Sequence, residues 1–518
     1  MVSLIPAPQH VRTDGEHLPF DGVTVRSHDL GAHAALLEEH VHELVAAAAT
    51  TAAAPATAAP AAAPATAAPA AATAVEGTAA PSAADGLPAV APLAVVLRLD
   101  AAAGPEGSAS DERYSVVVDA AGATLAAPTP AGLRHAAQTL ARLVDAPVAG
   151  ERPARVAHAV VEDAPRYPWR GLSVDLARHF FGLDALRAVV DVLAAYKLNV
   201  LHLHLTDDQG WRIESPTRPE LAKLSSDGDC SEGDGGHLSL ADFRALQDYA
   251  ADRFVRVVPE IDVPGHINAA THVYGELRPD GVPTDAYTGI EVGFSRLTFD
   301  LPATEQFLRD VFTDLARATD GEHVHFGGDE VLTMEADEYA RFVELCERVV
   351  LEAGKKPVAW QEAAKAPLRP GTIVQYWDTH KADLTYLVDA ARAGARVLLS
   401  PANKVYLDMK YTADFPLGQD WAGLVELRDA YEWEPEDVVE GLPASSIEGV
   451  EGAVWTERIP TTDDLFTMLL PRLAAVAEVA WTAPERKDWD DFRGRVAAEA
   501  PAWRRDGRSF HATPQVDW

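Results

Sequence analysis

"GLSVDLARHFFGLDALRAVVDVLAAYKLNVLHLHLTDD", residues 171–208, contains the pattern that decides the fold of most of this chain. Apolar runs start at residues 171 and 199, and each has the length and composition of a strand buried on both faces. The stretch between them, 184–197, has the apolar spacing of an amphipathic helix. A strand, a helix and a second strand in this order predict a βαβ unit with parallel strands.

The same alternation continues toward the C-terminus. Further strand-like runs are "VRVVPEID" from 255, "HVHFGG" from 323, "PVAWQE" from 357, "TIVQYWD" from 372, "RVLLSP" from 396 and "GAVWTE" from 452. Amphipathic helices are expected between several of them, for example over 239–253 and 335–353. Eight such runs with mostly helical connections predict an α/β fold, a (β/α)8 barrel over residues 156–518. A doubly wound open sheet is the alternative, but no glycine-rich phosphate loop follows the first strand.

The region before the barrel has a different character. Strands are expected over 93–100 and 113–120, and a helix over 130–145, which together predict a small α+β domain over residues 1–155. A segment of alanine, threonine and proline, at about 46–85, interrupts this domain. Its low complexity and frequent prolines predict a disordered insertion.

The bulk composition narrows the range of partners and locations. The chain has 518 residues and a formal net charge of −35, which argues against nucleic acid as a ligand. No strongly apolar stretch is long enough for a membrane helix, so no membrane role is expected. The first residues lack the pattern of a signal peptide, and the two cysteines are too few for a disulfide framework. We therefore expect a cytoplasmic protein with unpaired thiols.

Acidic and aromatic residues gather where the predicted strands end. Catalytic groups of such barrels lie at the carboxyl ends of the strands. The acidic residues at these ends are Asp175, Asp207, Asp208, Glu260, Asp262, Asp329, Glu330, Glu362, Asp378, Asp408 and Glu457. Tryptophans occur in the same regions: Trp211, Trp360, Trp377, Trp421 and Trp455. Indole faces pack on the C–H faces of sugar rings while carboxylates accept hydrogen bonds from hydroxyls, so a carbohydrate site is predicted.

Two other kinds of chemistry are compatible with these residues. His202 and His204 face the same side of a strand, and with His266, His325 and Asp329 they could form a metal site of a barrel hydrolase. Alternatively, these histidines line the barrel interior and are held by carboxylates. A conventional glycosidase would instead use two carboxylates from different strands. Asp329 and Glu330 are adjacent, and neighbours on a strand point to opposite faces.

Seven blocks of sequence occur in a recognisable order. They are "RGLSVDLARHFF" (170–181), "KLNVLHLHLTDDQGWRIE" (197–214), "VVPEIDVPGHINAA" (257–270), "HFGGDEV" (325–331), "QYWD" (375–378), "VYLDMKY" (405–411) and "GAVWTE" (452–457). Together they resemble the β-N-acetylhexosaminidases of glycoside hydrolase family 20. The resemblance covers roughly residues 110–500 and includes the small domain before the barrel.

The resemblance implies an exo-acting, retaining mechanism assisted by the substrate, in which the 2-acetamido oxygen of the sugar is the nucleophile. Glu330 would be the general acid and base, and Asp329 would hold the acetamide N–H. Tyr406 would bond to the acetamide oxygen. Asp207 and His266 would support Glu330.

The remaining positions of the family pattern concern substrate binding. By the same resemblance, Trp360, Trp377 and Trp455 would wall the acetamido pocket, and Trp421 would stack near the sugar. Arg178, Asp408 and Glu457 would bind ring hydroxyls of a terminal residue. The resemblance implies no metal and no cofactor. Release of a disaccharide, as by a lacto-N-biosidase, and a binding protein without catalysis are the alternatives. His237 stands where the family commonly has an aromatic residue.

Overall fold

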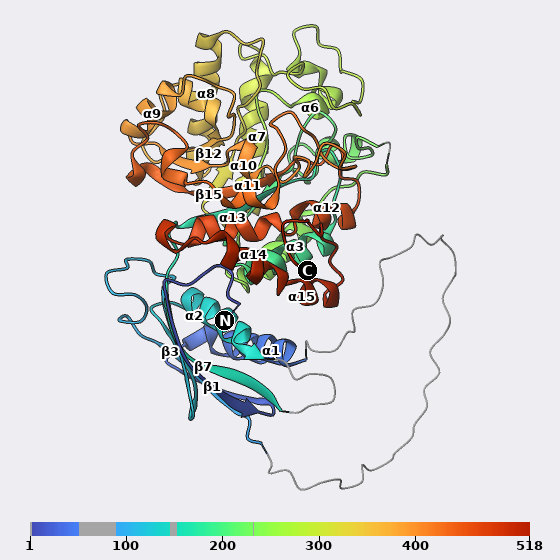
Figure 1. Cartoon of the computed structure of the whole chain (residues 1–518). Helices are drawn as coiled ribbons and strands as arrows, with labels where there is room; N and C mark the ends of the chain where they lie inside the picture. Colours follow the sequence, from blue (N-terminus) through green and yellow to red (C-terminus); the bar gives the residue numbers. More distant parts are fainter. Residues whose placement is uncertain (1–2, 51–89, 146–152, 232) are drawn as a thin grey trace, which may run out of the picture.

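The computed structural model describes residues 3–50, 90–145, 153–231 and 233–518. It consists of a closed barrel of eight strands and a separate sheet domain below it in Figure 1. The predicted architecture, a (β/α)8 barrel preceded by a small α+β domain, is confirmed. Among the described residues, no helix combines the length and the apolar character that crossing a membrane requires.

All neighbouring strands of the barrel run parallel, and the last strand pairs with the first. Each strand overlaps or directly adjoins one of the eight predicted runs. In chain order the strands are β8 (Trp169–Asp175), β9 (Val200–His204), β10 (Arg256–Glu260), β11 (His323–His325), β12 (Lys356–Trp360), β13 (Ile373–Tyr376), β14 (Arg396–Leu399) and β15 (Ile447–Val454). Every residue of β8 and β9 is buried, as expected for strands covered on both faces.

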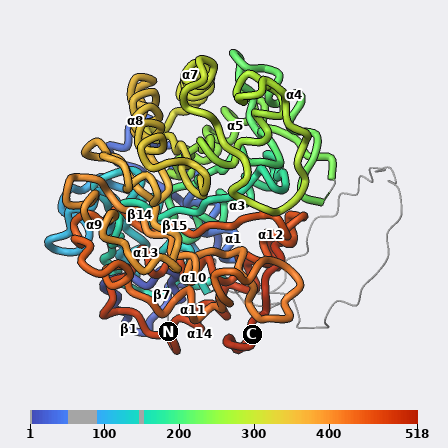
Figure 2. The backbone as a smooth tube through the Cα atoms, turned by 90° about the horizontal axis from the view of Figure 1, so that it is seen from above, coloured from blue at the N-terminus to red at the C-terminus, as the bar shows by residue number. Residues whose placement is uncertain are grey.

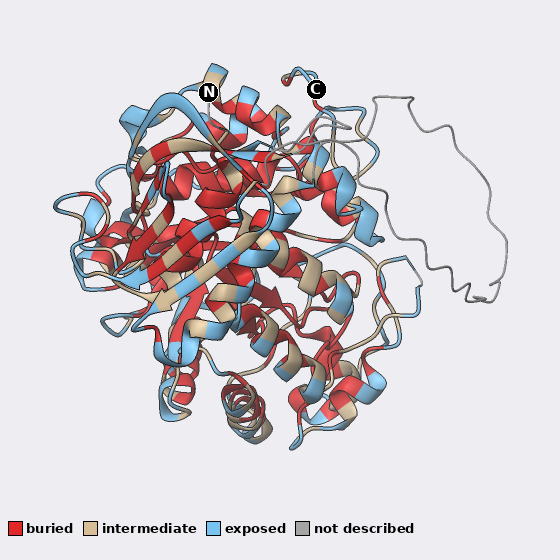
Figure 3. Ribbon diagram, turned by 90° about the horizontal axis from the view of Figure 1, so that it is seen from below, coloured by how far each residue is buried: buried red, intermediate tan, exposed pale blue. Residues whose placement is uncertain are grey.

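Helices surround the barrel, and Figure 2 shows α7, α8 and α9 following one another around its outside. The longer helices are α3 (Leu183–Ala195), α5 (Leu240–Ala251), α7 (Pro302–Ala318), α8 (Ala336–Glu352), α9 (Thr385–Arg392), α12 (Thr462–Leu469), α13 (Arg472–Trp481) and α14 (Trp489–Ala497). Shorter ones are α4 (Glu220–Leu224), α6 (Asn268–Val273), α10 (Ala402–Val405), α11 (Leu427–Tyr431) and α15 (Ala500–Arg505). Their apolar stripes face the strands, so buried residues concentrate inside the ring (Figure 3).

The inside of the barrel has an apolar layer and a polar layer. The apolar cluster consists of Trp169, Val200, Val258, Val358, Ile373 and Leu398, which lie at the first to third positions of their strands. Nearer the carboxyl ends, histidines of β9 bond to glutamates of β10 and β15. The polar layer leads directly to the residues that follow the strands.

The small domain is a seven-stranded sheet in the order β1-β7-β4-β5-β3-β2, with β6 paired to β7. Its strands are β1 (His10–Phe20), β2 (Val23–His28), β3 (Leu93–Leu99), β4 (Tyr114–Asp119), β5 (Gly122–Ala127), β6 (Val144–Asp145) and β7 (Ala154–Asp163). Two helices, α1 (Ala34–Ala49) and α2 (Pro130–Arg142), pack on the sheet through one apolar cluster. Thr129 caps α2 by accepting the Gly132 N–H.

Two predicted boundaries in this domain differ from the structure. The domain does not end at residue 155, because β7 continues to Asp163 and pairs with both β1 and β4. The predicted disordered insertion does not begin at residue 46, because residues 46–49 are the last turn of α1. Its part from residue 51 to about 85 lies outside the described residues. The prediction of unpaired thiols at Cys230 and Cys346 is confirmed.

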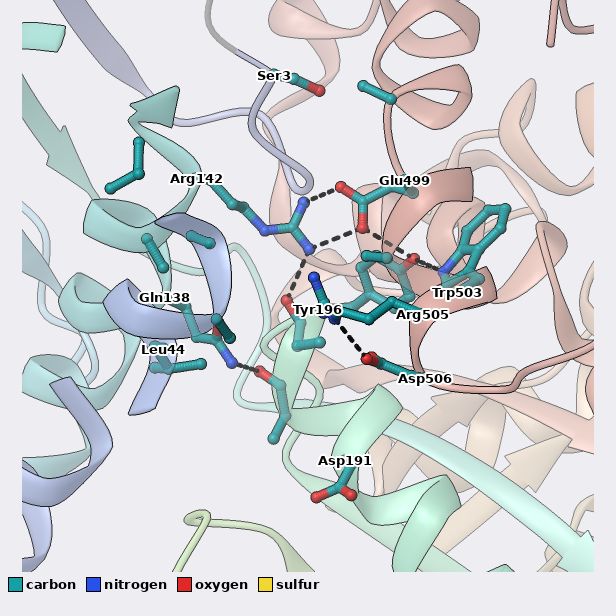
Figure 4. Close-up of a pocket in the computed structure, with 18 of the residues that line it drawn as sticks. Ser3, Leu44, Gln138, Arg142, Asp191, Tyr196, Glu499, Trp503, Arg505 and Asp506 are labelled. Atoms are coloured by element: carbon teal, nitrogen blue, oxygen red, sulfur yellow. Dashed lines mark hydrogen bonds and ion pairs between the residues drawn. The ribbon is translucent and has the colours of Figure 1, made fainter. Parts of the chain in front are cut away.

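Polar contacts join the two domains at the interface shown in Figure 4. Arg142 at the end of α2 donates to both oxygens of Glu499, which lies between α14 and α15. The Tyr196 hydroxyl also donates to Glu499, and the Trp503 indole N–H donates to Tyr196 at 2.9 Å. Because Arg142 and Glu499 are mostly buried, this ion pair is shielded from water and holds the small domain against the barrel.

Candidate active site

A cavity of about 410 Å³ opens at the carboxyl ends of the barrel strands. It collects ten of the twelve residues predicted for the site: Arg178, Asp207, His266, Asp329, Glu330, Trp377, Tyr406, Trp421, Trp455 and Glu457. Trp360 and Asp408 lie outside its lining. Side chains separated by up to about half the chain thus meet in one hollow, as the barrel topology requires.

The turn after β11 solves the problem of two adjacent acidic residues. The strand ends at His325, so the alternation of a strand no longer applies to Asp329 and Glu330. Gly327, Gly328 and Glu330 all have positive φ, of 70°, 106° and 49°. This left-handed path brings both carboxylates to the cavity. Positive φ is costly for a glutamate, and strained residues of this kind gather at functional sites.

Gly327 is required by its neighbour as well as by its φ. A Cβ at this position would lie 1.7 Å from Asp262 Oδ1. The same Asp262 oxygen accepts the Gly328 N–H at 3.0 Å, and the Tyr339 hydroxyl donates to the Gly328 carbonyl at 2.6 Å. The two glycines therefore let the turn close around the Asp262 carboxyl, which fixes the backbone that carries the acidic pair.

A chain of polar contacts runs inward from Glu330. His266 Nε2 lies 3.3 Å from Glu330 Oε2 and 3.6 Å from Asp329 Oδ2. Its other ring nitrogen, Nδ1, lies 3.1 Å from Asp207 Oδ1. Asp207 is held in turn by Arg178 at 2.8 Å and by His204 at 2.9 Å. The predicted supporting residues thus lie behind Glu330: His266 contacts Glu330, and Asp207 contacts His266.

The charges of this chain are set by burial and by the neighbours. Burial disfavours the charged form of His266, but Asp207 and Asp329 outweigh it and raise the pKa of His266 well above its usual value. Burial would raise the pKa of Asp207, yet Arg178 and His266 lower it well below the usual range. At neutral pH an imidazolium therefore faces Glu330, and a carboxylate anchors that imidazolium.

Asp262 is a site residue to which the sequence assigned no role. Burial and the nearby Asp329 charge raise the pKa of Asp262 well above its usual value, which favours its protonated form. Burial raises the pKa of Asp329, and the hydrogen bond between the Asp262 and Asp329 side chains opposes that rise. The position of Asp262 at a strand end was visible in the sequence, but its contact with Asp329 depends on the turn.

Aromatic side chains form one side of the cavity. The rings of Trp377 and Tyr406 stand nearly parallel, with 8° between their planes and 6.4 Å between centroids. Trp421 is close to perpendicular to both. Trp455 lies 6.1 Å from Tyr406, centroid to centroid. Burial, together with the Asp408 and Asp329 carboxyl groups, raises the pKa of Tyr406 well above its usual value, so its phenol keeps its proton as a donor.

Trp360 differs from its predicted position in the cavity wall. It is only 1% exposed and does not line the cavity, and its ring lies 5.8 Å from that of Trp455, which does. Its indole N–H donates to Glu260 inside the barrel at 2.8 Å. Trp360 therefore supports the wall from behind, because it is the last residue of β12 and points inward.

Several polar atoms around the cavity have no hydrogen-bond partner among the described residues. They are Arg178 Nε and Nη1, both carboxyl oxygens of Asp408, Glu457 Oε2 and Asp329 Oδ1. Burial and the Glu457 carboxyl raise the pKa of Asp408 well above its usual value, although Asp408 is not part of the lining itself. Buried polar atoms are normally hydrogen bonded, so this group is suited to a ligand rich in hydroxyl and amide groups.

The histidines considered as metal ligands are engaged with carboxylates. His204 contacts Glu260 at 2.6 Å through Nδ1 and Asp207 at 2.9 Å through Nε2. His202 lies between Glu451 at 2.9 Å and Glu260 at 3.1 Å. Both rings therefore have the role of barrel-lining histidines held by acidic neighbours. Close groups of His, Asp and Glu remain nearby, such as His204 with Asp207 and Asp262.

The sequence interpretation also missed several residues that line the cavity. These are Ile290, Val292, His380, Lys381 and Gln419, while Asp378 was identified at a strand end but given no role. Ile290 and Val292 belong to the long connection between α6 and α7, which has no strand or helix close to them. A loop of this length in a compact domain is frequently functional, and that length was the signal available in the sequence.

Comparisons with known proteins agree with this geometry. Two family profiles match: "Glycosyl hydrolase family 20, domain 2" over residues 1–164, and "Glycosyl hydrolase family 20, catalytic domain" over residues 167–339 and 332–484. A β-N-acetylhexosaminidase of Cellulomonas fimi is 56% identical over 83% of this chain and 85% of its own length.

Solved structures point to the same family. The N-acetyl-β-hexosaminidase of Streptomyces plicatus, in complex with thio-NAglucal, superposes with a TM-score of 0.86 at 36% identity, covering 100% of this chain and 98% of that one. The family 20 β-N-acetylhexosaminidase of Streptomyces coelicolor A3(2) gives the same score and identity, covering 100% and 99%. Profiles, relative and structures together establish that the chain belongs to glycosyl hydrolase family 20.

Proposed function

We propose that this protein is an exo-acting, retaining β-N-acetylhexosaminidase that removes terminal β-linked GlcNAc or GalNAc. One observation carries the proposal. The turn at Gly327–Gly328 brings Asp329 and Glu330 into one cavity, around which several other buried polar atoms lack a hydrogen-bond partner among the described residues. The Cellulomonas fimi relative carries the name of this activity, and the Streptomyces plicatus enzyme was solved in complex with thio-NAglucal.

The first half of the reaction needs a nucleophile, an acid and a group that stabilises positive charge. The substrate's acetamide oxygen attacks the anomeric carbon and forms an oxazolinium ion. The bond from that carbon to the leaving oxygen breaks, and Glu330 gives its proton to this oxygen. Asp329 accepts the acetamide N–H and stabilises the developing charge, while the Tyr406 hydroxyl donates to the acetamide oxygen.

The second half reverses the roles of the same groups. The Glu330 carboxylate takes a proton from a water molecule, whose oxygen attacks the anomeric carbon from the side the leaving group occupied. The carbon–oxygen bond of the oxazolinium ring breaks, which restores the acetamide and retains the configuration. The imidazolium of His266, 3.3 Å from Glu330, stabilises the carboxylate between the two steps.

The far end of the cavity favours release of one sugar at a time. Arg178 and Glu457 line the cavity and Asp408 interacts with Glu457, and all three have atoms without a hydrogen-bond partner that can bind ring hydroxyls. Because these side chains are buried, a second sugar beyond the terminal residue would meet the barrel wall. Release of a disaccharide through the same mechanism is the other candidate, and this closed end disfavours it.

The test compares two variants on aryl glycosides of GlcNAc and GalNAc. Glu330→Gln should abolish most turnover when the leaving group is poor, because the amide cannot donate the proton. Asp329→Asn should lower turnover and weaken inhibition by an N-acetyl thiazoline, which mimics the cyclised intermediate. Near-normal rates of Glu330→Gln on a poor leaving group, with the protein folded, would contradict the assignment.

A metal-dependent hydrolysis is tested separately. Full activity after dialysis against excess EDTA excludes the metal alternative, since the barrel histidines would then have no catalytic ion to bind. Loss of activity that a divalent ion restores would support it instead. Analysis of the products from a tetrasaccharide substrate distinguishes the release of single sugars from the release of disaccharides.

A further inference from the structure

A second, larger cavity lies between the small domain and the barrel and shares no residue with the active site. Its volume is about 1130 Å³. Helices α1 and α2 form one wall, and α3 and the segment around α15 form the other (Figure 4). The cluster of Arg142, Tyr196, Glu499 and Trp503 stands along one side of it, with Asp191 set apart from this cluster. The other charged residues that line this cavity have no part in the proposed reaction or in the domain contacts described above.

Five arginines line this cavity, and four of them face acidic partners. The pairs are Arg142 with Glu499, Arg253 with Asp191, Arg505 with Asp506, and Arg508 with Asp506 and Asp191. The fifth, Arg134, forms no ion pair with any described residue. It is only 5% exposed, and its Nε and Nη1 have no hydrogen-bond partner among the residues that the structure describes. A buried guanidinium is normally paired, so Arg134 is the exception here.

The groups that face Arg134 leave room for an additional negative charge. Asp191 attracts it, but that carboxylate already accepts from Arg253 at 2.7 Å and from Tyr249 at 2.8 Å. Glu43 attracts it from an exposed position on α1 and makes no ion pair with it, and Arg253 repels it. The charged groups near Arg134 are therefore a cation, an acid that already accepts from other donors, and an exposed acid that makes no ion pair with it.

His40 supplies a second unpaired group at the same place. It is 7% exposed, it lines the cavity, and its Nδ1 has no partner within the described part of the chain. Burial, with the charges of Arg134 and Arg253, lowers the pKa of His40 to about 3. The ring is therefore neutral at physiological pH, and one of its nitrogens is free to donate to an oxygen atom.

We propose that this cavity binds a small organic oxyanion, with the Arg134 guanidinium as its anchor and His40 as a second contact. The planar fork of an arginine matches two oxygens of a carboxylate or of a phosphate monoester. The volume leaves space for the rest of such a molecule, beside the amide of Gln138. Because the whole chain carries a formal net charge of −35, binding would arise from this local site and not from a general attraction for anions.

The first experiment measures thermal unfolding of the full-length protein in phosphate, in acetate and in chloride at constant ionic strength. An oxyanion that binds only the folded state raises the unfolding midpoint in a saturable way, by about one to three degrees at concentrations well above its Kd. A response to phosphate alone indicates a phosphate ester, and a response to acetate alone indicates a carboxylate. Equal midpoints in all three salts would overturn the proposal.

Variants identify the anchor. Arg134→Gln should remove the response, whereas Arg244→Gln, which removes an exposed arginine paired with Asp320 outside the cavity, should keep it. Hydrolysis of an aryl glycoside within about twofold of the wild-type rate shows that each variant is folded. Arg134→Lys, which keeps the charge but loses the fork, should weaken phosphate binding about tenfold in a calorimetric titration. An unchanged response in Arg134→Gln would refute the assignment.

The exposed Glu43 is the competing counter-charge. If Glu43 swings onto Arg134 in solution, the wild type will show no oxyanion response and Glu43→Gln will show one, which overturns the proposal. If the cavity is an oxyanion site, the wild type responds and Glu43→Gln responds equally or more strongly.

Discussion

Replacement of Gly327 by alanine tests whether the turn after β11 creates the catalytic arrangement. The residue has a φ of 70°, and an added Cβ would lie 1.7 Å from Asp262 Oδ1. Real Cβ atoms do not approach oxygens so closely, so either the Asp262 carboxyl or the turn must move. Asp262 bonds to the Gly328 N–H and to Asp329, and both movements therefore displace the acidic pair.

The size of the effect follows from two contributions. An alanine in the left-handed region costs about 1–2 kcal/mol in folding free energy. The overlap with Asp262 adds about 1–3 kcal/mol, as in overpacked cores. A shift of about 1 Å in a catalytic group lowers the rate by roughly 100-fold. We therefore expect Gly327→Ala to unfold at a lower temperature and to lose about two orders of magnitude in kcat/KM.

Gly281→Ala is the matched control for this variant. Gly281 has almost the same φ, 69°, but a Cβ there would meet nothing within 4 Å. It should therefore show the cost of the backbone conformation without the overlap, and kcat/KM on an aryl N-acetylglucosaminide should stay within about twofold. If Gly327→Ala folded and retained activity similar to that of Gly281→Ala, the turn would not be what aims Asp329 and Glu330.

Three further predictions concern the aromatic side of the cavity, the carboxyl group proposed to bind a ring hydroxyl, and the interface between the two domains. Tyr406→Phe should lower kcat/KM roughly 100-fold, because its phenol donates to the oxygen that attacks, and similar rates of both proteins would refute this. Asp408→Asn should raise KM by about 10- to 100-fold, because the acceptor of a substrate hydroxyl is weakened; a methyl-capped substrate lacking that hydroxyl should not distinguish the two proteins. Burial lowers the pKa of His135 to about 4, so the folded state resists a proton that the unfolded chain binds below about 6.5. Wild-type stability should therefore fall relative to His135→Gln between pH 6.5 and 4, by up to about 1.4 kcal/mol per pH unit in urea titrations, and parallel curves would contradict it.

The barrel was predictable because each of its strands is short, apolar and followed by a polar turn. Parallel strands covered on both faces leave this local signal in every segment, so all eight runs were located. The edge of the small domain left no such signal. β1 is mostly exposed and interrupted by a register shift, and its pairing of His10 with Glu162 joins segments far apart in sequence. The boundary at residue 155 was wrong because β7 crosses it, and only the pairing of β7 with β1 and β4 assigns that strand to the small domain.

The site was predictable as a set of residues but not as a geometry. Side-chain alternation along β12 cannot distinguish a tryptophan that lines the cavity from one that supports it, and Trp360 is of the second kind. Likewise, the role of Asp262 depends on the space left by the missing Cβ of Gly327. Such contacts arise from the turn and from distant neighbours, so residue type and spacing do not reveal them.

The adjacency of Asp329 and Glu330 finally explains their different roles. Because the turn leaves the strand before the pair, the first carboxylate enters the buried layer beside Asp262 and the second remains nearer the mouth. Their side chains are 11% and 29% exposed. The group that must hold an amide throughout the reaction is thus shielded from water, while the group that must protonate a leaving oxygen and then activate water stays accessible to both. Two carboxylates on separate strands could move independently. Asp329 and Glu330 share a single turn, so a change that moves one must also move the other.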